Sequence, residues 1–429
     1  MTAGSLVAIC LLPAAAGLAA PLPIGTGTNW TYNAELGLRE TWDSNIFLQD
    51  TEPDRTKVPQ AAAPFQESFV TTVTPRVGIE YRSNPRFAAT VGYAPEIAFY
   101  HSASSEDYVA HRGTVNLSGK DCEVPWQFAN AFGWVEGGDE GLYFGAPGGA
   151  PALGGIPIRD RRDQFVYRGK LNATWTSGAW FLRPVGSGYW HDFHTAQKDP
   201  TDPTQPTNKY YENYIDRREL DMGLDGGRKV GDKTRVYAGY RYGWEGEGDV
   251  PGSPYHYDAT FHRPTVGIEG QPWKWLKADF SIGPDIHHTI HEVAPGFDRD
   301  YTTLWVDGVI TLLPTKQDTI VLTWRENTQP AFSSTSVYDD KFYDLAAKHQ
   351  FGEHWFLSGG FRLYIGDWFS PVNRDDWIYT WTAGVAYRHD AHWSAELAYS
   401  YDWVESQVPN TPGREFTRNL VWLGAKWTL

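Results

Sequence analysis

Side chains of opposite character alternate along one segment after another of this chain, and this alternation constrains the fold more than any other feature. From Trp377 to His389, almost every second side chain is aromatic or aliphatic, and most of those between are small or charged. The same pattern returns from Trp393 to Trp403 after a short break. A period of two sustained over about ten residues is that of a β-strand with two unlike faces. Aromatic residues at both ends of the apolar face predict strands that cross a lipid bilayer.

The composition excludes several classes of protein. The 429 residues include 37 Lys and Arg against 52 Asp and Glu, a net charge of −15, so we expect no nucleic-acid partner held by phosphate contacts. After residue 24 there is no apolar run of about 18 residues, which excludes a membrane protein built of helices. Yet 15% of the residues are aromatic. Polar strands with many rings are typical of a transmembrane barrel.

Short and long connections alternate between the predicted strands. Eight short turns joined to nine long loops predict 18 strands, with both termini on the short-turn side, or 16 if the segments Leu182–Tyr189 and Leu220–Asp225 are not strands. The short turns lie near Asn84, Cys122, Gly178, Gly231, Trp273, Lys316, Glu353 and Ala391. The longer stretches include Gln49–Pro64, Gly137–Arg162, Thr195–Glu212, Glu247–Thr260, Ala331–Asp340 and Gln407–Glu415. Prolines inside predicted strands indicate bulges or strand ends, at Pro75, Pro95, Pro264 and Pro284.

We therefore predict an all-β fold, a closed antiparallel transmembrane β-barrel with short periplasmic turns and long extracellular loops. No shift of composition marks a second domain, so the barrel is expected to occupy residues 21–429. Leu6 to Ala20 is an apolar run ending in small residues, which predicts a signal peptide over residues 1–20, although nothing before Leu6 is positively charged. A signal peptide for export and a transmembrane β-barrel together predict that the protein lies in the lipid of the bacterial outer membrane.

Two further segments resemble a known family. The run Glu40-Thr41-Trp42-Asp43-Ser44-Asn45-Ile46-Phe47 ends the first predicted strand, and Thr72 to Tyr81 (TVTPRVGIEY) opens the second. Both are similar to segments of the outer-membrane β-barrel porin family, although the likeness in motif covers only about the first 80 residues. The resemblance implies a passive channel, and some relatives are thought to export polysaccharide. Alternation up to Leu429, with Trp427 near the end, resembles the terminal signal read by the barrel-assembly machinery.

The longest connection, Gly137–Arg162, is rich in Gly, Ala and Pro and joins the fifth and sixth predicted strands. Loops of this length are uncommon unless they are functional or disordered. Acidic residues near its start and basic ones near its end would set a transverse field across a pore. We therefore consider it as a pore constriction, with a solvated surface loop as the alternative. The constriction residues are Asp139, Glu140, Arg159, Arg161 and Arg162.

Charged residues recur on the polar face of the predicted strands. In a dry core each would be costly and would need a partner, whereas in a wet lumen it pairs with neighbours or with water. They predict a hydrated interior. The predicted pore-lining residues are Arg39, Arg76, Glu96, Arg168, Lys170, Arg217, Arg241, Arg325, Arg362, Arg388 and Glu396.

Other kinds of site find little support in the sequence. His287 and His291 would lie about 13 Å apart on a strand, too far to bind one zinc ion, so we expect solvated histidines at a strand end and no metal. Cys10 falls in the leader and leaves Cys122 alone, so no disulfide framework is predicted. No nucleotide-binding or hydrolase motif occurs, and we predict neither a cofactor nor an enzyme. The preferred function is passive diffusion of small hydrophilic solutes, with polysaccharide export and a surface adhesin as alternatives.

Overall fold

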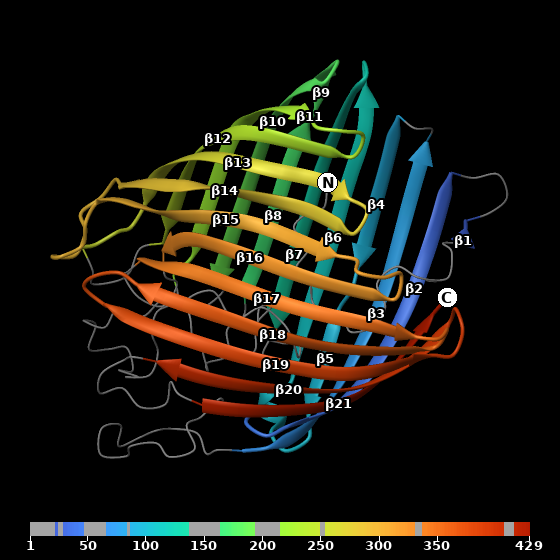
Figure 1. Cartoon of the computed structure of the whole chain (residues 1–429). Coiled ribbons are helices and arrows are strands. Elements are labelled where there is room, and N and C mark those ends of the chain that lie inside the picture. The colour runs from blue at the N-terminus through green and yellow to red at the C-terminus, as the bar shows by residue number, and fades with distance from the viewer. Residues whose placement is uncertain are drawn as a thin grey trace, which may run out of the picture.

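The computed structural model is a closed antiparallel β-barrel (Figure 1). It describes residues 22–24, 29–46, 66–83, 86–136, 164–193, 215–248, 254–330, 337–406 and 416–429. The wall strands are β2 (Trp30–Asp43), β3 (Ser68–Ser83), β4 (Phe87–Tyr93), β5 (Glu96–Tyr100), β6 (Tyr108–Asp121), β7 (Val124–Glu136), β8 (Gln164–Ala173), β9 (Trp175–Ser177), β10 (Trp180–Phe193), β11 (Arg217–Lys229), β12 (Thr234–Glu247), β13 (Ala259–Trp273), β14 (Leu276–Thr289), β15 (Asp300–Leu312), β16 (Asp318–Pro330), β17 (Val337–Phe351), β18 (Trp355–Trp368), β19 (Arg374–Arg388), β20 (Trp393–Ser406) and β21 (Phe416–Thr428).

Apart from β4 with β5 and β8 with β9, each wall strand pairs with the next along the chain, and β2 pairs with β21 to close the barrel. In the described residues β4 and β5 form one interrupted strand and β8 and β9 another, so the wall has the predicted 18 strands. Pro95 lies at the first interruption, where the missing N–H cannot join the ladder. The segments Leu182–Tyr189 and Leu220–Asp225 lie within β10 and β11, so the alternative of 16 strands is wrong.

Short turns gather at one end of the barrel. Seven predicted turns are described, near Cys122, Gly178, Gly231, Trp273, Lys316, Glu353 and Ala391, whereas Asn84 lies outside the described residues. The backbone N–H of Leu429 donates to the carbonyl of Ala34 at this end, so the first and last wall strands meet there as predicted. Most residues of the predicted long connections lie outside the described ones.

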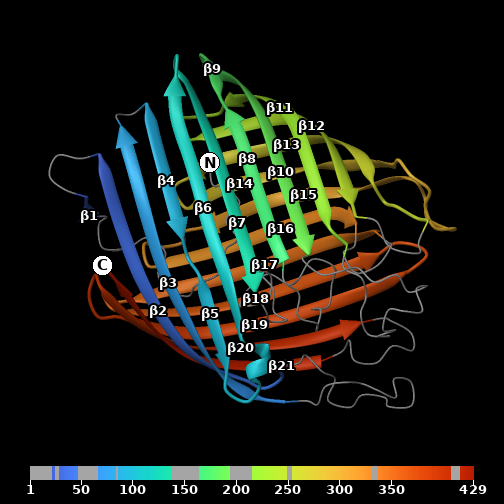
Figure 2. The ribbon, with the colours of Figure 1, turned by 180° about the vertical axis from the view of Figure 1, so that it is seen from behind.

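Two smaller elements complete the described structure, the short strand β1 (Leu22–Pro23) beside β2 and a 3-10 turn over Ser104–Glu106. Seen from both sides, strands of the two facing walls cross at an angle (Figures 1 and 2). Such a crossing follows from the tilt of strands in a closed barrel. No helix in the described part of the chain is long and apolar enough to cross a membrane.

The outer face carries two aromatic girdles with an aliphatic band between them. On β10, Trp180 near the turns and Trp190 near the loops are 62% and 43% exposed, and Trp393 and Trp403 stand likewise on β20. Ten residues span about 33 Å along a strand, which a tilt of about 40° reduces to roughly 25 Å of height. This height matches the apolar band of a membrane barrel. The exposed aliphatic residues between the girdles include Leu36, Leu38, Leu171, Leu182, Leu220, Met222, Leu224, Val266, Leu304, Leu345, Leu357, Leu397, Val421 and Leu423. The wall therefore spans a membrane.

A charge placed in this band should destabilise the barrel according to its depth. Leu397 is 50% exposed midway between the two tryptophans of β20, and Leu397→Arg should lower the free energy of unfolding by about 2–4 kcal/mol. The control Ala395→Arg, on the same face but close to the turn-side girdle, should cost about 0–1 kcal/mol. Urea unfolding in lipid vesicles measures both. Equal losses at the two positions would contradict a lipid band centred near Leu397.

Two prolines interrupt the ladder between β13 and β14. Pro264 and Pro284 cannot donate, and pairing of the two strands stops after His262 and resumes at Val266. Gly283 lets the backbones approach here, because a Cβ atom at this position would lie 1.9 Å from the carbonyl oxygen of Pro264. The missing side chain of Gly283 therefore makes the close approach possible.

The close approach at Gly283 can be tested by adding one methyl group. Gly283→Ala should lower the free energy of unfolding by about 1–3 kcal/mol, because the backbone of β13 has to shift. Gly226→Ala on β11 is the matched control, since its Cβ atom would meet nothing within 4 Å. Urea midpoints of the two variants give the comparison. A Gly283→Ala variant as stable as the control would show that the strands separate at no cost.

Candidate functional site

The inward face of the wall gathers buried polar side chains. On β10, Trp180 and Leu182 face outward and are exposed, whereas Phe181 and Arg183, which alternate with them, are buried. The same alternation continues around the barrel, so charged residues project into its interior. Those that are buried include Asp43, Glu96, Arg183, Arg217, Asp221, Asp225, Glu245, Arg263, Asp285, Asp340, Asp344, Arg362, Asp376, Asp402 and Arg418.

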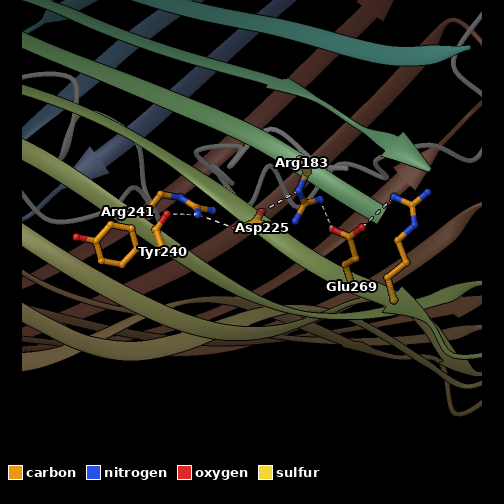
Figure 3. Close-up of polar contacts among 6 residues, drawn as sticks. Arg183, Asp225, Tyr240, Arg241 and Glu269 are labelled. Atoms are coloured by element: carbon orange, nitrogen blue, oxygen red, sulfur yellow. Dashed lines mark hydrogen bonds and ion pairs between the residues drawn. The ribbon is translucent and has the colours of Figure 1, made fainter. Parts of the chain in front are cut away.

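Most of the buried arginines hold carboxylates from other strands (Figure 3). Arg183 of β10 donates to Asp225 of β11 at 2.9 Å and to Glu269 of β13 at 2.6 Å. Arg241 donates to the second oxygen of Asp225 at 2.7 Å, and Arg235 donates to Glu269 at 3.1 Å. The five charges form one network across four neighbouring strands. A buried charge is tolerated when it is paired and hydrogen-bonded in this way.

Other pairs follow the same rule around the interior. Arg263 holds Asp285 through two hydrogen bonds of 3.0 and 2.7 Å, the geometry that guanidinium and carboxylate groups favour. Arg362 of β18 donates to Asp344 of β17 at 3.0 Å. The inward face is therefore charged but largely neutralised by local pairs.

The seam between the first and last strands has its own ion pair. Arg418 of β21 donates to both carboxylate oxygens of Asp43 of β2, and its Nε lies 3.0 and 3.1 Å from them. The two residues are 4% and 1% exposed. The contact joins residues 375 positions apart in the chain. It therefore fastens the barrel where the sheet closes on itself.

The motif that carries the family resemblance lies at this seam. Ser44 exchanges hydrogen bonds with Asn419, its N–H donating to the carbonyl and its Oγ accepting from the N–H. The amide of Asn45 donates to the carbonyl of Thr417 at 3.1 Å, and Ile46 is buried just beyond. The Asp-Ser-Asn-Ile run therefore ties the end of β2 to the start of β21.

One hydrogen bond spans part of the interior between strands that are not neighbours in the wall. Arg217 of β11 donates through Nη2 to Oε1 of Gln329 of β16 at 2.8 Å. Along the wall these strands are five spacings apart, about 24 Å at the usual distance between strands. The same glutamine donates to Asp340 of β17 at 2.7 Å. Side chains of strands a little over a quarter of the circumference apart therefore meet here and narrow the lumen.

All eleven predicted lining residues lie on inward-facing positions of their strands. Glu96, Arg217 and Arg362 are buried, and Arg76 and Lys170 are exposed near the middle of their strands. The half-buried residues are Arg39, Arg168, Arg241, Arg325, Arg388 and Glu396. A role in lining a pore stays a prediction. The predicted constriction residues Asp139, Glu140, Arg159, Arg161 and Arg162 lie outside the described residues, as does the predicted signal peptide over residues 1–20.

The prediction of solvated histidines is wrong for His287. Its ring is 1% exposed, lies 3.2 Å from carboxylate oxygens of both Glu245 and Asp285, and stacks on Tyr301 with centroids 4.8 Å apart. The loop-side interior is packed, so an inward histidine is enclosed there, whereas the outward His288 is exposed. Within the described ranges no group of three or more His, Cys, Asp or Glu residues could hold a metal ion.

No family model matches the chain, and no curated protein does. Among solved structures it is similar to the FrpB iron transporter from Neisseria meningitidis, at 9% identity and a TM-score of 0.46, over 94% of this chain and 82% of that one. It is also similar to two proteins of Pseudomonas aeruginosa. The outer membrane protein opdK has 9% identity and a TM-score of 0.43 over 93% and 99% of the chains, and OccK9 (OpdG) has 11% and 0.44 over 93% and 98%. The likeness is one of barrel fold and assigns no solute.

Proposed function

We propose that the protein is an outer-membrane channel through which small hydrophilic solutes diffuse passively. The observation that carries the proposal is a wall with an aliphatic and aromatic outer face and a charged inner face. On the inner face Arg76 and Lys170 are exposed near the middle of their strands. Charged side chains that are exposed on the inner face require water around them. A hydrated interior within a membrane-spanning wall is the basis of a channel.

Polysaccharide export finds no specific support in the described interior. Sugar rings would stack on open aromatic faces, but cations lie over several of the inward rings. Arg263 lies 4.4 Å from the centre of Phe261 and 5.0 Å from that of Trp305, and Arg325 lies 4.6 Å from that of Phe342. Cation–π contacts of this kind occupy the faces that a sugar would need. Passive diffusion is therefore the function we retain.

Planar-bilayer recording tests the proposal. Purified protein that migrates as a folded barrel on unheated gels should give stepwise current increases in KCl, with a linear current–voltage relation at low voltage. Heat-denatured protein is the control and should give none. Folded, inserted protein that carries no current would contradict the channel and favour a surface adhesin.

A further inference from the structure

Three inward arginines, Arg39, Arg217 and Arg325, have a buried side-chain nitrogen without a hydrogen-bond partner in the described part of the chain. Two of them, Arg217 and Arg325, act on the same carboxylate, that of Asp340. Arg217 is 4% exposed, and although Nη2 donates to Gln329, its Nε and Nη1 have no hydrogen-bond partner in the described part of the chain. Arg325 likewise has no partner for Nε and lies against the ring of Phe342. Burying a cation without a matching anion is costly. The chain therefore keeps positive charge here in spite of the free-energy cost of burying it.

A third arginine adds to this charge. The guanidinium carbons of Arg168 and Arg217 lie 5.2 and 5.8 Å from the ring centre of Tyr189, so the two cations share one tyrosine. Arg168 also lies close enough to Arg325 for repulsion. All three arginines attract the carboxylate of Asp340. Three cations from β8, β11 and β16 thus act on one acid, close to the Arg217–Gln329 hydrogen bond.

The neighbouring acids do not cancel the excess. Glu245 faces His287 at 3.2 Å. Glu219 and Asp307 act on Arg217 and Arg325 only from beyond the distance of an ion pair. Elsewhere on the inner face a carboxylate lies within about 3 Å of each buried guanidinium. Among the described residues, no carboxylate forms an ion pair with Arg217 or Arg325. The missing anion can come from outside the chain.

We propose that Arg217 and Arg325, with Arg168 beside them, bind the oxyanion group of a passing solute, a carboxylate or a phosphate. Guanidinium nitrogens donate to such groups through short, charge-assisted hydrogen bonds. The oxygen atoms of the solute would supply the hydrogen-bond acceptors that Nε and Nη1 of Arg217 and Nε of Arg325 lack. A binding site at the level bridged by Arg217 and Gln329 would favour anions even though the whole chain carries a net charge of −15. This inference assigns a solute class to the proposed channel. The part of its test that measures a current rests on the proposed function as a channel.

Titration calorimetry of the folded protein in detergent tests the site without requiring a current. The probes are succinate and inorganic phosphate, with KCl at matched ionic strength as the background. The wild type should bind at least one of them, and Arg217→Gln should weaken that binding about tenfold or more, the effect of one charge-assisted hydrogen bond. Arg218→Gln is the matched control, since it removes the same charge from the adjacent position, where the side chain lies outside over Trp190. Binding by this control should equal that of the wild type.

Bilayer recording supplies the second arm. The bound probe should block the KCl current of the wild type in a saturable way, and Arg325→Gln should weaken the block and shift the reversal potential toward cations. Binding of succinate alone identifies a carboxylate site, and binding of phosphate alone a phosphate site. Absence of binding by both probes to folded wild type would overturn the inference. Normal current without any block would overturn it while leaving the channel intact, whereas binding without current would contradict only the channel.

Discussion

Replacing Arg418 with methionine should lower the free energy of unfolding by about 3–5 kcal/mol, among the largest losses expected for a single substitution in this wall. The change leaves the carboxylate of Asp43 buried at 1% exposure without its cation. It also removes one of the side-chain links between the first and last strands, where the barrel closes. Urea unfolding in lipid vesicles, followed by tryptophan fluorescence, measures the loss.

A second ion pair on the same two strands is the matched control. Lys426 of β21 lies 3.6 Å from Glu35 of β2 at the turn-side end, and both side chains are partly exposed. Lys426→Met should therefore cost less than about 1 kcal/mol. The double variant Asp43→Leu/Arg418→Met should recover much of the stability lost by Arg418→Met, because no buried charge remains. Equal losses for Arg418→Met and Lys426→Met would show that the buried Asp43–Arg418 pair contributes no more to stability than the partly exposed Glu35–Lys426 pair.

The sequence predicts the wall well because its signals are local. A period of two places Trp393, Leu397 and Trp403 on one face of β20 regardless of the rest of the chain, and all three are exposed on the outer face. Turn positions follow for the same reason. At Gly178 and Gly231 the backbone has φ of +58° and +90°, conformations that glycine adopts easily, so both residues mark turns in the sequence.

The interior is less predictable because its contacts join distant strands. The Arg217–Gln329 bond links residues 112 positions apart, and neither residue has a neighbour in the sequence that signals it. Gln329 was not predicted at all, since only charged residues were singled out on the polar face. The Asp43–Arg418 pair was missed as well, although Asp43 lies in the motif that carries the family resemblance. Only the closed register of β2 with β21 brings these two side chains together.

Removing part of the longest loop should have the largest effect on the current. The Gly137–Arg162 connection joins β7 to β8, and we predict that it narrows the pore, with Asp139 and Glu140 opposed by Arg159, Arg161 and Arg162. A barrel of this size is too wide for its wall side chains alone to fill. Deleting Tyr143–Leu153 should therefore raise the single-channel conductance markedly, and neutralising Arg161 and Arg162 should shift the selectivity toward cations.

The Arg217–Gln329 hydrogen bond provides the competing explanation for the constriction and the control. Gln329→Ala removes the acceptor that Arg217 reaches across the interior, and it leaves the loop unchanged. If the loop limits the current, the deletion raises conductance strongly and Gln329→Ala raises it little. If Gln329→Ala instead raises the conductance more than the deletion does, the narrowest level lies at the Arg217–Gln329 bond and the loop lies outside the pore. This comparison requires that both variants migrate as folded barrels. Because both variants are measured by the same single-channel recording, the two positions of the constriction are directly compared.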